Sequence, residues 1–117
     1  MDLLGRYAWY IATSQERAWP CGNLLPNDLG LFDMLGNVYE WCNGRYEDYP
    51  PDKGGNVDDS INTYDYIKDT YTRLIRGGTF FYIPPFLRSA IRRGFAPSYR
   101  DIFIGFRPSR TSQKTRD

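Results

Sequence analysis

The sequence predicts one small α+β domain in which much of the chain is irregular. Its 117 residues, 41% hydrophobic and 17% aromatic, suffice for one core and hardly for two. Residues 38–41 alternate as a half-buried strand does, whereas residues 43–73 are polar and keep no apolar period. We therefore expect residues 1–117 to form a single domain with a long polar loop at 43–73.

The N-terminal quarter is predicted to support the core. Apolar side chains recur over residues 3–13, which suits a short amphipathic helix or an irregular packed segment. Residues 14–27 contain two prolines, Cys21 and Gly22, and are typical of a loop laid across the core. Neither segment shows a catalytic pattern.

The chain is organised around residues 30–41, where an apolar run leads into a Gly36-Asn37 turn and then into the strand. A second unusual stretch, Arg76-Gly77-Gly78-Thr79-Phe80, lies nearer the C-terminus. Its two adjacent glycines indicate a backbone path that side chains would block. We expect both stretches to belong to one structural unit.

Several motifs along the chain resemble, in the same order, the C-terminal half of the formylglycine-generating-enzyme domain, also called the sulfatase-modifying-factor domain. They are Tyr7-Ala8-Trp9-Tyr10, residues 26–34, Gly36-Asn37-Val38, Glu40-Trp41, Arg76-Gly77-Gly78, Arg88-Ser89-Ala90 and Gly105-Phe106-Arg107. The resemblance implies a C-type-lectin-like fold. Because one fold supports many functions, it identifies a scaffold and leaves the activity to the site.

A calcium site is the most specific prediction that the resemblance carries. It implies that Asp33 and Glu40 supply side-chain oxygens and that Gly36 and Val38 supply main-chain oxygens. Such an oxygen-only shell is what calcium prefers, and we expect the ion to be structural. The alternative is that Asp33 caps the turn and Glu40 pairs with a buried arginine.

No copper is expected. In the catalytic members of the family two cysteines hold a copper ion, and the matching positions here are Tyr82 and Leu87, which lack the thiolate that Cu(I) requires. Thr79 stands where the family has a serine.

The chain contains no histidine, which excludes Ser-His-Asp triads and His-ligated zinc. A non-catalytic domain is favoured. The competing hypothesis is a copper-dependent formylglycine-generating oxidase that uses other groups, or a fragment of one.

Composition further limits the partners and the compartment. A net charge of +1 argues against nucleic-acid binding. There is no apolar run of membrane-spanning length and no leader pattern, so we expect a cytoplasmic protein without membrane insertion.

Cys21 and Cys42 fit no redox or zinc spacing, and we expect them to be buried apolar residues rather than a disulfide.

Arginine is concentrated in the last third of the chain. Residues 76–107 contain six arginines and one acid, Asp101, whereas acidic residues crowd the middle of the sequence. We expect some of these arginines to brace the acidic loop and the carbonyls of the core.

The same third is predicted to form a recognition surface. Residues 80–86 are too consecutively apolar to be buried by one alternating strand, so some must face outward or line a groove. Aromatic residues beside arginine are typical of interface centres. We assign Phe80, Leu87, Ile104 and Phe106 to the core. The predicted ligand-binding residues are Phe81, Tyr82, Ile83, Pro85, Phe86, Ile91, Arg93, Phe95, Tyr99, Asp101 and Phe103. The ligand is expected to be a protein or a small molecule.

A second hypothesis concerns how this segment varies. Residues 76–107 lack Lys, Glu, Gln, Met and Trp, which are the residues that codons ending in a pyrimidine cannot encode. The segment resembles the variable region of receptors that retroelements diversify on the same scaffold. It equally resembles non-diversified relatives fused to bacterial Ser/Thr kinases, so both interpretations stay open.

Overall fold

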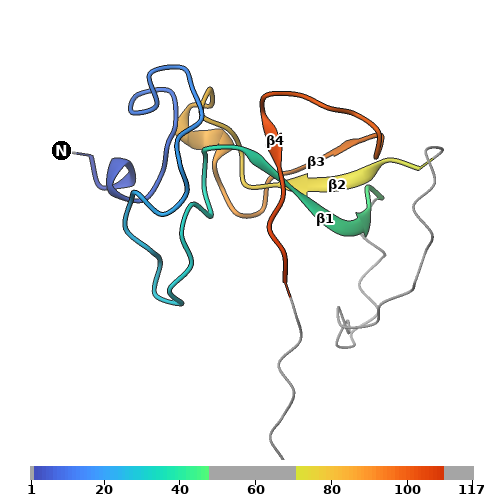
Figure 1. Ribbon diagram of the computed structural model, residues 1–117, viewed down its shortest axis with the longest axis horizontal. Coiled ribbons are helices and arrows are strands. Elements are labelled where there is room, and N and C mark those ends of the chain that lie inside the picture. The colour runs from blue at the N-terminus through green and yellow to red at the C-terminus, as the bar shows by residue number, and fades with distance from the viewer. Residues whose placement is uncertain (1, 48–70, 110–117) are drawn as a thin grey trace, which may run out of the picture.

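The computed structural model describes residues 2–47 and 71–109, and in them a single mixed sheet is the main regular element (Figure 1). The sheet has the order β3-β2-β1-β4. Its strands are β1 (Tyr39–Arg45), β2 (Arg73–Arg76), β3 (Arg92–Phe95) and β4 (Ile104–Gly105), and two short 3-10 helices, η1 (Leu4–Arg6) and η2 (Pro84–Phe86), lie outside it. Most of the remaining described chain is turns and loops, as the sequence predicts.

The parallel pairing of β4 with β1 brings distant parts of the chain together. β1 and β2 pair antiparallel, as do β2 and β3. The chain then leaves β3, passes above the sheet and returns at its other edge, where β4 pairs parallel to β1 with Ile104 opposite Tyr39 (Figure 1). This return brings residues 95–104 next to the start of β1, although they are far from it in sequence.

The predicted polar loop is shorter than its expected bounds of 43–73. Residues 43–45 belong to β1 and Arg73 begins β2. The ends of the loop pack on the sheet, because Tyr46 covers Gly94 and the Arg45 guanidinium lies 4.0 Å from the Tyr71 ring centre. The rest of the predicted loop, residues 48–70, lies outside the described residues.

The buried apolar residues gather beside the sheet and under the N-terminal turns. They are Ala8, Tyr10, Tyr39, Ile75, Phe80 and Leu87. The predictions for Phe80 and Leu87 are confirmed, but the prediction for Phe106 is wrong, because 81% of it is exposed. Neighbouring side chains of an extended chain point to opposite sides, and Arg107 points inward to Glu40.

Gly36 joins the two glycine-containing stretches that the sequence singles out. Its N–H donates to the Gly77 carbonyl at 2.6 Å, and the Asn37 N–H donates to the Trp9 carbonyl at 2.8 Å. The Phe80 N–H in turn donates to the Asn37 carbonyl at 2.8 Å. The expectation that the stretches form one structural unit is therefore confirmed.

Arginines satisfy main-chain carbonyls across the described residues. Arg73 donates to the Asn43 carbonyl at 2.9 Å, Arg76 to the Ser89 carbonyl at 2.9 Å, and Arg88 to the Pro85 carbonyl at 3.2 Å. Arg76 and Arg88, from the arginine-rich segment, thus brace exposed loops, while most of the acidic loop that this segment was expected to brace lies outside the described residues.

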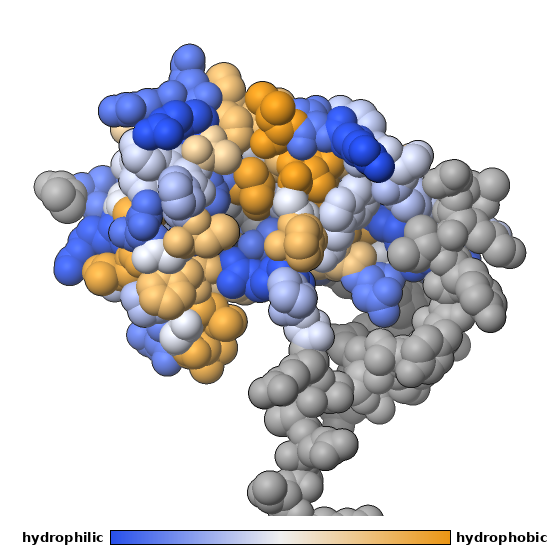
Figure 2. Space-filling model, in the orientation of Figure 1, coloured by the Kyte–Doolittle hydropathy of each residue, from blue (hydrophilic) through white to orange (hydrophobic). Residues whose placement is uncertain are grey.

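Apolar side chains are also exposed away from the sheet. Figure 2 shows apolar surface at lower left, over the loop that Figure 1 colours from blue to cyan. Large exposed hydrophobic residues in this stretch are Leu25, Leu29, Leu31, Phe32 and Met34.

Candidate functional site

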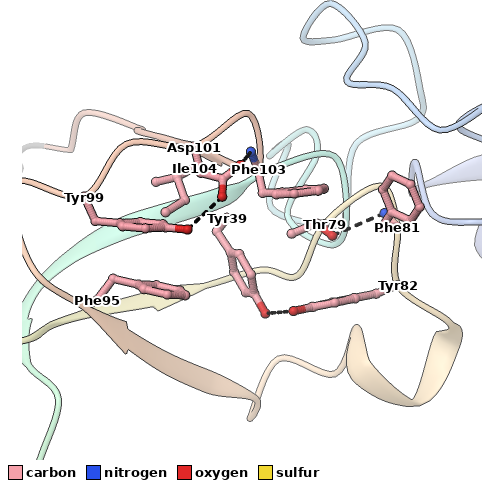
Figure 3. A pocket seen from close by; sticks show the side chains of 9 residues that line it. All are labelled: Tyr39, Thr79, Phe81, Tyr82, Phe95, Tyr99, Asp101, Phe103 and Ile104. Carbon is pink, nitrogen blue, oxygen red and sulfur yellow. Dashed lines mark hydrogen bonds between the residues drawn. The ribbon is translucent and has the colours of Figure 1, made fainter.

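A mostly apolar pocket of about 150 Å³ opens where the returning chain meets the start of β1 (Figure 3). We call it the aromatic pocket. It is lined by Tyr39, Thr79, Phe81, Tyr82, Phe95, Tyr99, Asp101, Phe103 and Ile104. These residues come from β1, from the 79–82 turn, from β3, from the segment leading into β4 and from the start of β4 itself. The pocket therefore depends on the long-range pairing of β4 with β1.

Tyr39 and Tyr82 form the inner part of the pocket. Tyr39 is 3% exposed, and its hydroxyl donates to the Tyr82 hydroxyl at 2.7 Å. The rings meet edge to face, with centroids 5.6 Å apart. Burial, and then the hydrogen bond with Tyr82, raise the pKa of Tyr39, and the nearby Arg93 guanidinium offsets part of this rise. Tyr39 is therefore a neutral hydroxyl at physiological pH.

Phe95 and Tyr99 form the outer wall of the pocket. Their rings stack with centroids 4.6 Å apart. The Tyr99 hydroxyl donates to Asp101 Oδ2 at 2.8 Å, which raises the pKa of Tyr99, and the Phe103 N–H donates to Asp101 Oδ1 at 3.4 Å. Asp101 thus fixes both Tyr99 and the turn that carries Phe103.

The structure brings some of the predicted ligand-binding residues together and separates others. Those that line the aromatic pocket are Phe81, Tyr82, Phe95, Tyr99, Asp101 and Phe103. Ile83, Pro85 and Phe86 are exposed at η2, and Ile91 and Arg93 lie outside the pocket lining.

Sequence reasoning missed three lining residues, Tyr39, Thr79 and Ile104. Tyr39 carried a signal, since the alternation over 38–41 places it on one face of a strand. That face becomes a pocket wall only because β4 returns beside it.

Three of the four predicted calcium positions, Asp33, Val38 and Glu40, line a second, wider groove of about 640 Å³ together with Arg107, whereas Gly36 lies outside its lining. Asp33 is 7% exposed, and its Oδ2 accepts the Gly22 N–H at 2.9 Å. Its Oδ1 is buried and has no hydrogen-bond partner in the described part of the chain. A buried carboxylate oxygen left in this way is one that a cation would satisfy.

Glu40 has a different partner. Arg107 binds it through Nε, 3.1 and 3.0 Å from the two carboxylate oxygens, and through Nη2, 2.8 Å from Oε1. Arg107 Nη2 also donates to the Phe32 carbonyl at 2.6 Å and the Asp33 carbonyl at 3.3 Å. The hydrogen bond to Glu40 is the main reason that the pKa of Arg107 is raised. This guanidinium ties the turn at residues 33–40 to the chain after β4.

The fit of these residues to calcium is partial. The orphaned oxygen of Asp33 favours a cation, whereas the Glu40 carboxylate is shared with Arg107. Within residues 2–47 and 71–109, no three His, Cys, Asp or Glu side chains gather as a metal site, so main-chain carbonyls would have to complete the shell. The calcium site stays a prediction.

The two positions that match the copper ligands have other roles. The Tyr82 hydroxyl pairs with Tyr39, and Leu87 is 2% exposed in the core. Cys21 and Cys42 are both free thiols. Burial raises the pKa of the half-buried Cys42, but the expected burial of Cys21 is wrong, because its loop lies at the surface.

A small mixed sheet with few helices and long ordered loops is the architecture of a C-type-lectin-like domain, and the structural relatives share it. Residues 2–112 match the model of the sulfatase-modifying factor enzyme 1-like domain. The chain belongs to this family.

Two solved structures are similar to the chain. Treponema denticola variable protein 1 is 28% identical with a TM-score of 0.66, and the match covers 88% of this chain and 35% of that one. PvdO from Pseudomonas aeruginosa is 30% identical with a TM-score of 0.63, covering 87% and 38%. Chaperone protein LppX from Paenibacillus barcinonensis is 34% identical over 70 residues, which is 52% of this chain and 25% of that protein. The chain thus spans well under half the length of these relatives.

The described ranges, 2–47 and 71–109, contain no helix that is long and apolar enough to cross a membrane.

Proposed function

We propose that the domain is a non-catalytic recognition module that binds part of a protein or a small molecule in the aromatic pocket. The observation that carries this proposal is the pocket itself, a concave and mostly apolar site with a few placed polar groups. Such sites are the usual location of ligand binding on a scaffold. Neither copper position offers a thiolate, which favours recognition over the family's oxidation chemistry.

The rim of the pocket supports the proposal further. Phe81 is 42% exposed and Tyr99 is 41% exposed, although both are large aromatic residues. Exposed rings beside a concavity are the composition expected of a binding site, because a ligand that covers them removes apolar area from water.

Two aromatic residues of equal exposure test the proposal. Phe86 is 43% exposed on η2 and does not line the pocket, whereas Tyr99 does. Phenol is a probe small enough for the pocket. We expect Tyr99→Ala to weaken phenol binding by about tenfold and Phe86→Ala to change it less than about twofold. Ligand-observed NMR titrations measure both. Equal losses, or no loss with Tyr99→Ala, would contradict a site at the pocket.

Retroelement-driven diversification of the same pocket is the second candidate. All lining residues except Tyr39 fall within residues 76–107, the segment that lacks Lys, Glu, Gln, Met and Trp. One of the similar structures is a protein described as variable. Sequencing the DNA that flanks the gene tests this candidate. A nearby reverse-transcriptase gene with an adenine-substituted copy of the 76–107 coding stretch would support diversification. Flanking DNA that contains neither would contradict it.

We also propose that calcium stabilises the turn at residues 33–40, with the buried Asp33 Oδ1 among its ligands. A ligand that binds only the folded state at 100 times its Kd stabilises by about 2.7 kcal/mol, so millimolar calcium should raise the Tm. Asp33→Asn should abolish that rise. Asp33→Asn is a more specific test than Glu40→Ala, because removing Glu40 would also leave Arg107 without its carboxylate partner. A Tm that calcium leaves unchanged in the unaltered protein would overturn the site.

A further inference from the structure

We infer that the aromatic pocket selects a methylated ammonium group, such as the head of choline or a trimethylated lysine side chain. This inference deepens the proposed recognition function and rests on it. Aromatic rings from separate segments make up most of the lining, namely Tyr39, Phe81, Tyr82, Phe95, Tyr99 and Phe103. In Figure 3, Tyr99 and Phe95 lie on one side of Tyr39, and Phe103 and Tyr82 on the other. A cation beside aromatic faces is attracted by their quadrupoles.

Asp101 adds a negative charge to this lining. Its two oxygens accept hydrogen bonds from the Tyr99 hydroxyl and the Phe103 N–H, which are neutral donors. Within the described ranges, neither Asp101 oxygen is paired with a lysine or arginine side chain. No described basic side chain therefore pairs with this carboxylate, whose position at the pocket complements a bound cation.

Arg93 is the opposing charge. It lies outside the pocket lining and is exposed, and it influences the Tyr39 hydroxyl. Figure 3 shows this hydroxyl turned toward Tyr82 and away from Asp101. The acid and the arginine therefore act on different ends of the Tyr39 ring, and the cation belongs at the Asp101 end.

Size favours a methylated cation. A cavity of about 150 Å³ holds a benzene-sized molecule, and a tetramethylammonium ion is of similar size. A simple ammonium is strongly hydrated, and little in the apolar lining replaces its water. Methyl groups spread the charge and bury apolar area against the rings, so the methylated form loses less on entering.

The test compares choline with 3,3-dimethyl-1-butanol, its neutral isostere, by calorimetric titration of the whole chain. We expect choline to bind at least about tenfold more tightly, because only choline gains cation–π and Asp101 attraction. Asp101→Asn should weaken choline about five- to tenfold and the isostere less, because Asp101 also positions Tyr99 for both ligands, whereas Arg93→Gln should strengthen choline about two- to threefold. Trimethyl-lysine amide, run beside choline, shows which source of the cation binds better.

Each outcome decides something. Equal affinity for choline and its isostere, or a choline affinity that neither charge variant changes, overturns the cation inference. Should Asp101→Asn fail to fold, Arg93→Gln alone still tests the charge effect at a position outside the pocket. If choline and trimethyl-lysine amide do not bind, while phenol binds and its affinity depends on Tyr99, the cation inference fails and the recognition site stands. If phenol does not bind either, both fail.

Discussion

Gly36→Ala is expected to destabilise the domain by more than about 3 kcal/mol. A Cβ at this position would lie 2.2 Å from the Trp9 carbonyl oxygen, and the residue has a φ of +77°. The backbone must therefore move, which breaks the pairing of Asn37 with Trp9 and of Gly36 with Gly77. This is the junction on which the rest of the fold is organised.

Gly30→Ala is the matched control. Gly30 has nearly the same φ, +78°, but nothing lies within 4 Å of its Cβ position. Gly30→Ala should lower the unfolding free energy by only about 1 to 2 kcal/mol, the cost of placing an alanine in the left-handed region. Urea unfolding of both variants measures the difference. Losses of equal size would mean that the close approach of Trp9 to Gly36 does not constrain the fold.

Arg107→Met should cost about 2 to 4 kcal/mol of unfolding free energy. The change keeps much of the apolar stem but removes a guanidinium that binds the Glu40 carboxylate and the Phe32 and Asp33 carbonyls together. Glu40, whose side chain is only 21% exposed, is left as a poorly solvated charge. Arg107→Lys should recover only part of the loss, because an ammonium cannot reproduce the bidentate geometry.

Two comparisons give this expectation its control. Arg88→Met removes an exposed arginine with one carbonyl contact, and it should change stability by less than about 0.5 kcal/mol. Combining Arg107→Met with Glu40→Leu should cost less than the sum of the single changes, since the pair acts as a unit. Strict additivity in thermal or urea unfolding would contradict the pairing.

Local patterns predicted the parts of this fold that short-range chemistry determines. The alternation over 38–41 indicated β1, and the adjacent glycines at 77–78 indicated an unusual backbone path, which the structure places beside Gly36. The apolar run at 80–86, too dense for one strand face, indicated that some of its side chains are exposed, as Phe81, Ile83 and Phe86 are.

Long-range pairing determined the rest, and no local pattern contains it. The parallel pairing of Ile104 with Tyr39 makes Tyr39 a pocket wall, which the residues around Tyr39 do not indicate. The outward turn of Phe106 follows from the inward turn of Arg107 to Glu40, and that partner is 67 positions away. The alternation rule could not tell which of these two neighbours would face the core.

The most direct test of the recognition site is to map bound phenol on the ¹⁵N-labelled chain by amide chemical-shift changes. We expect the largest changes at Thr79, Phe95 and Asp101, around the aromatic pocket. Largest changes at Gly22, Asp33 and Arg107 would contradict this site, because binding would then lie in the wider groove and not at the aromatic pocket.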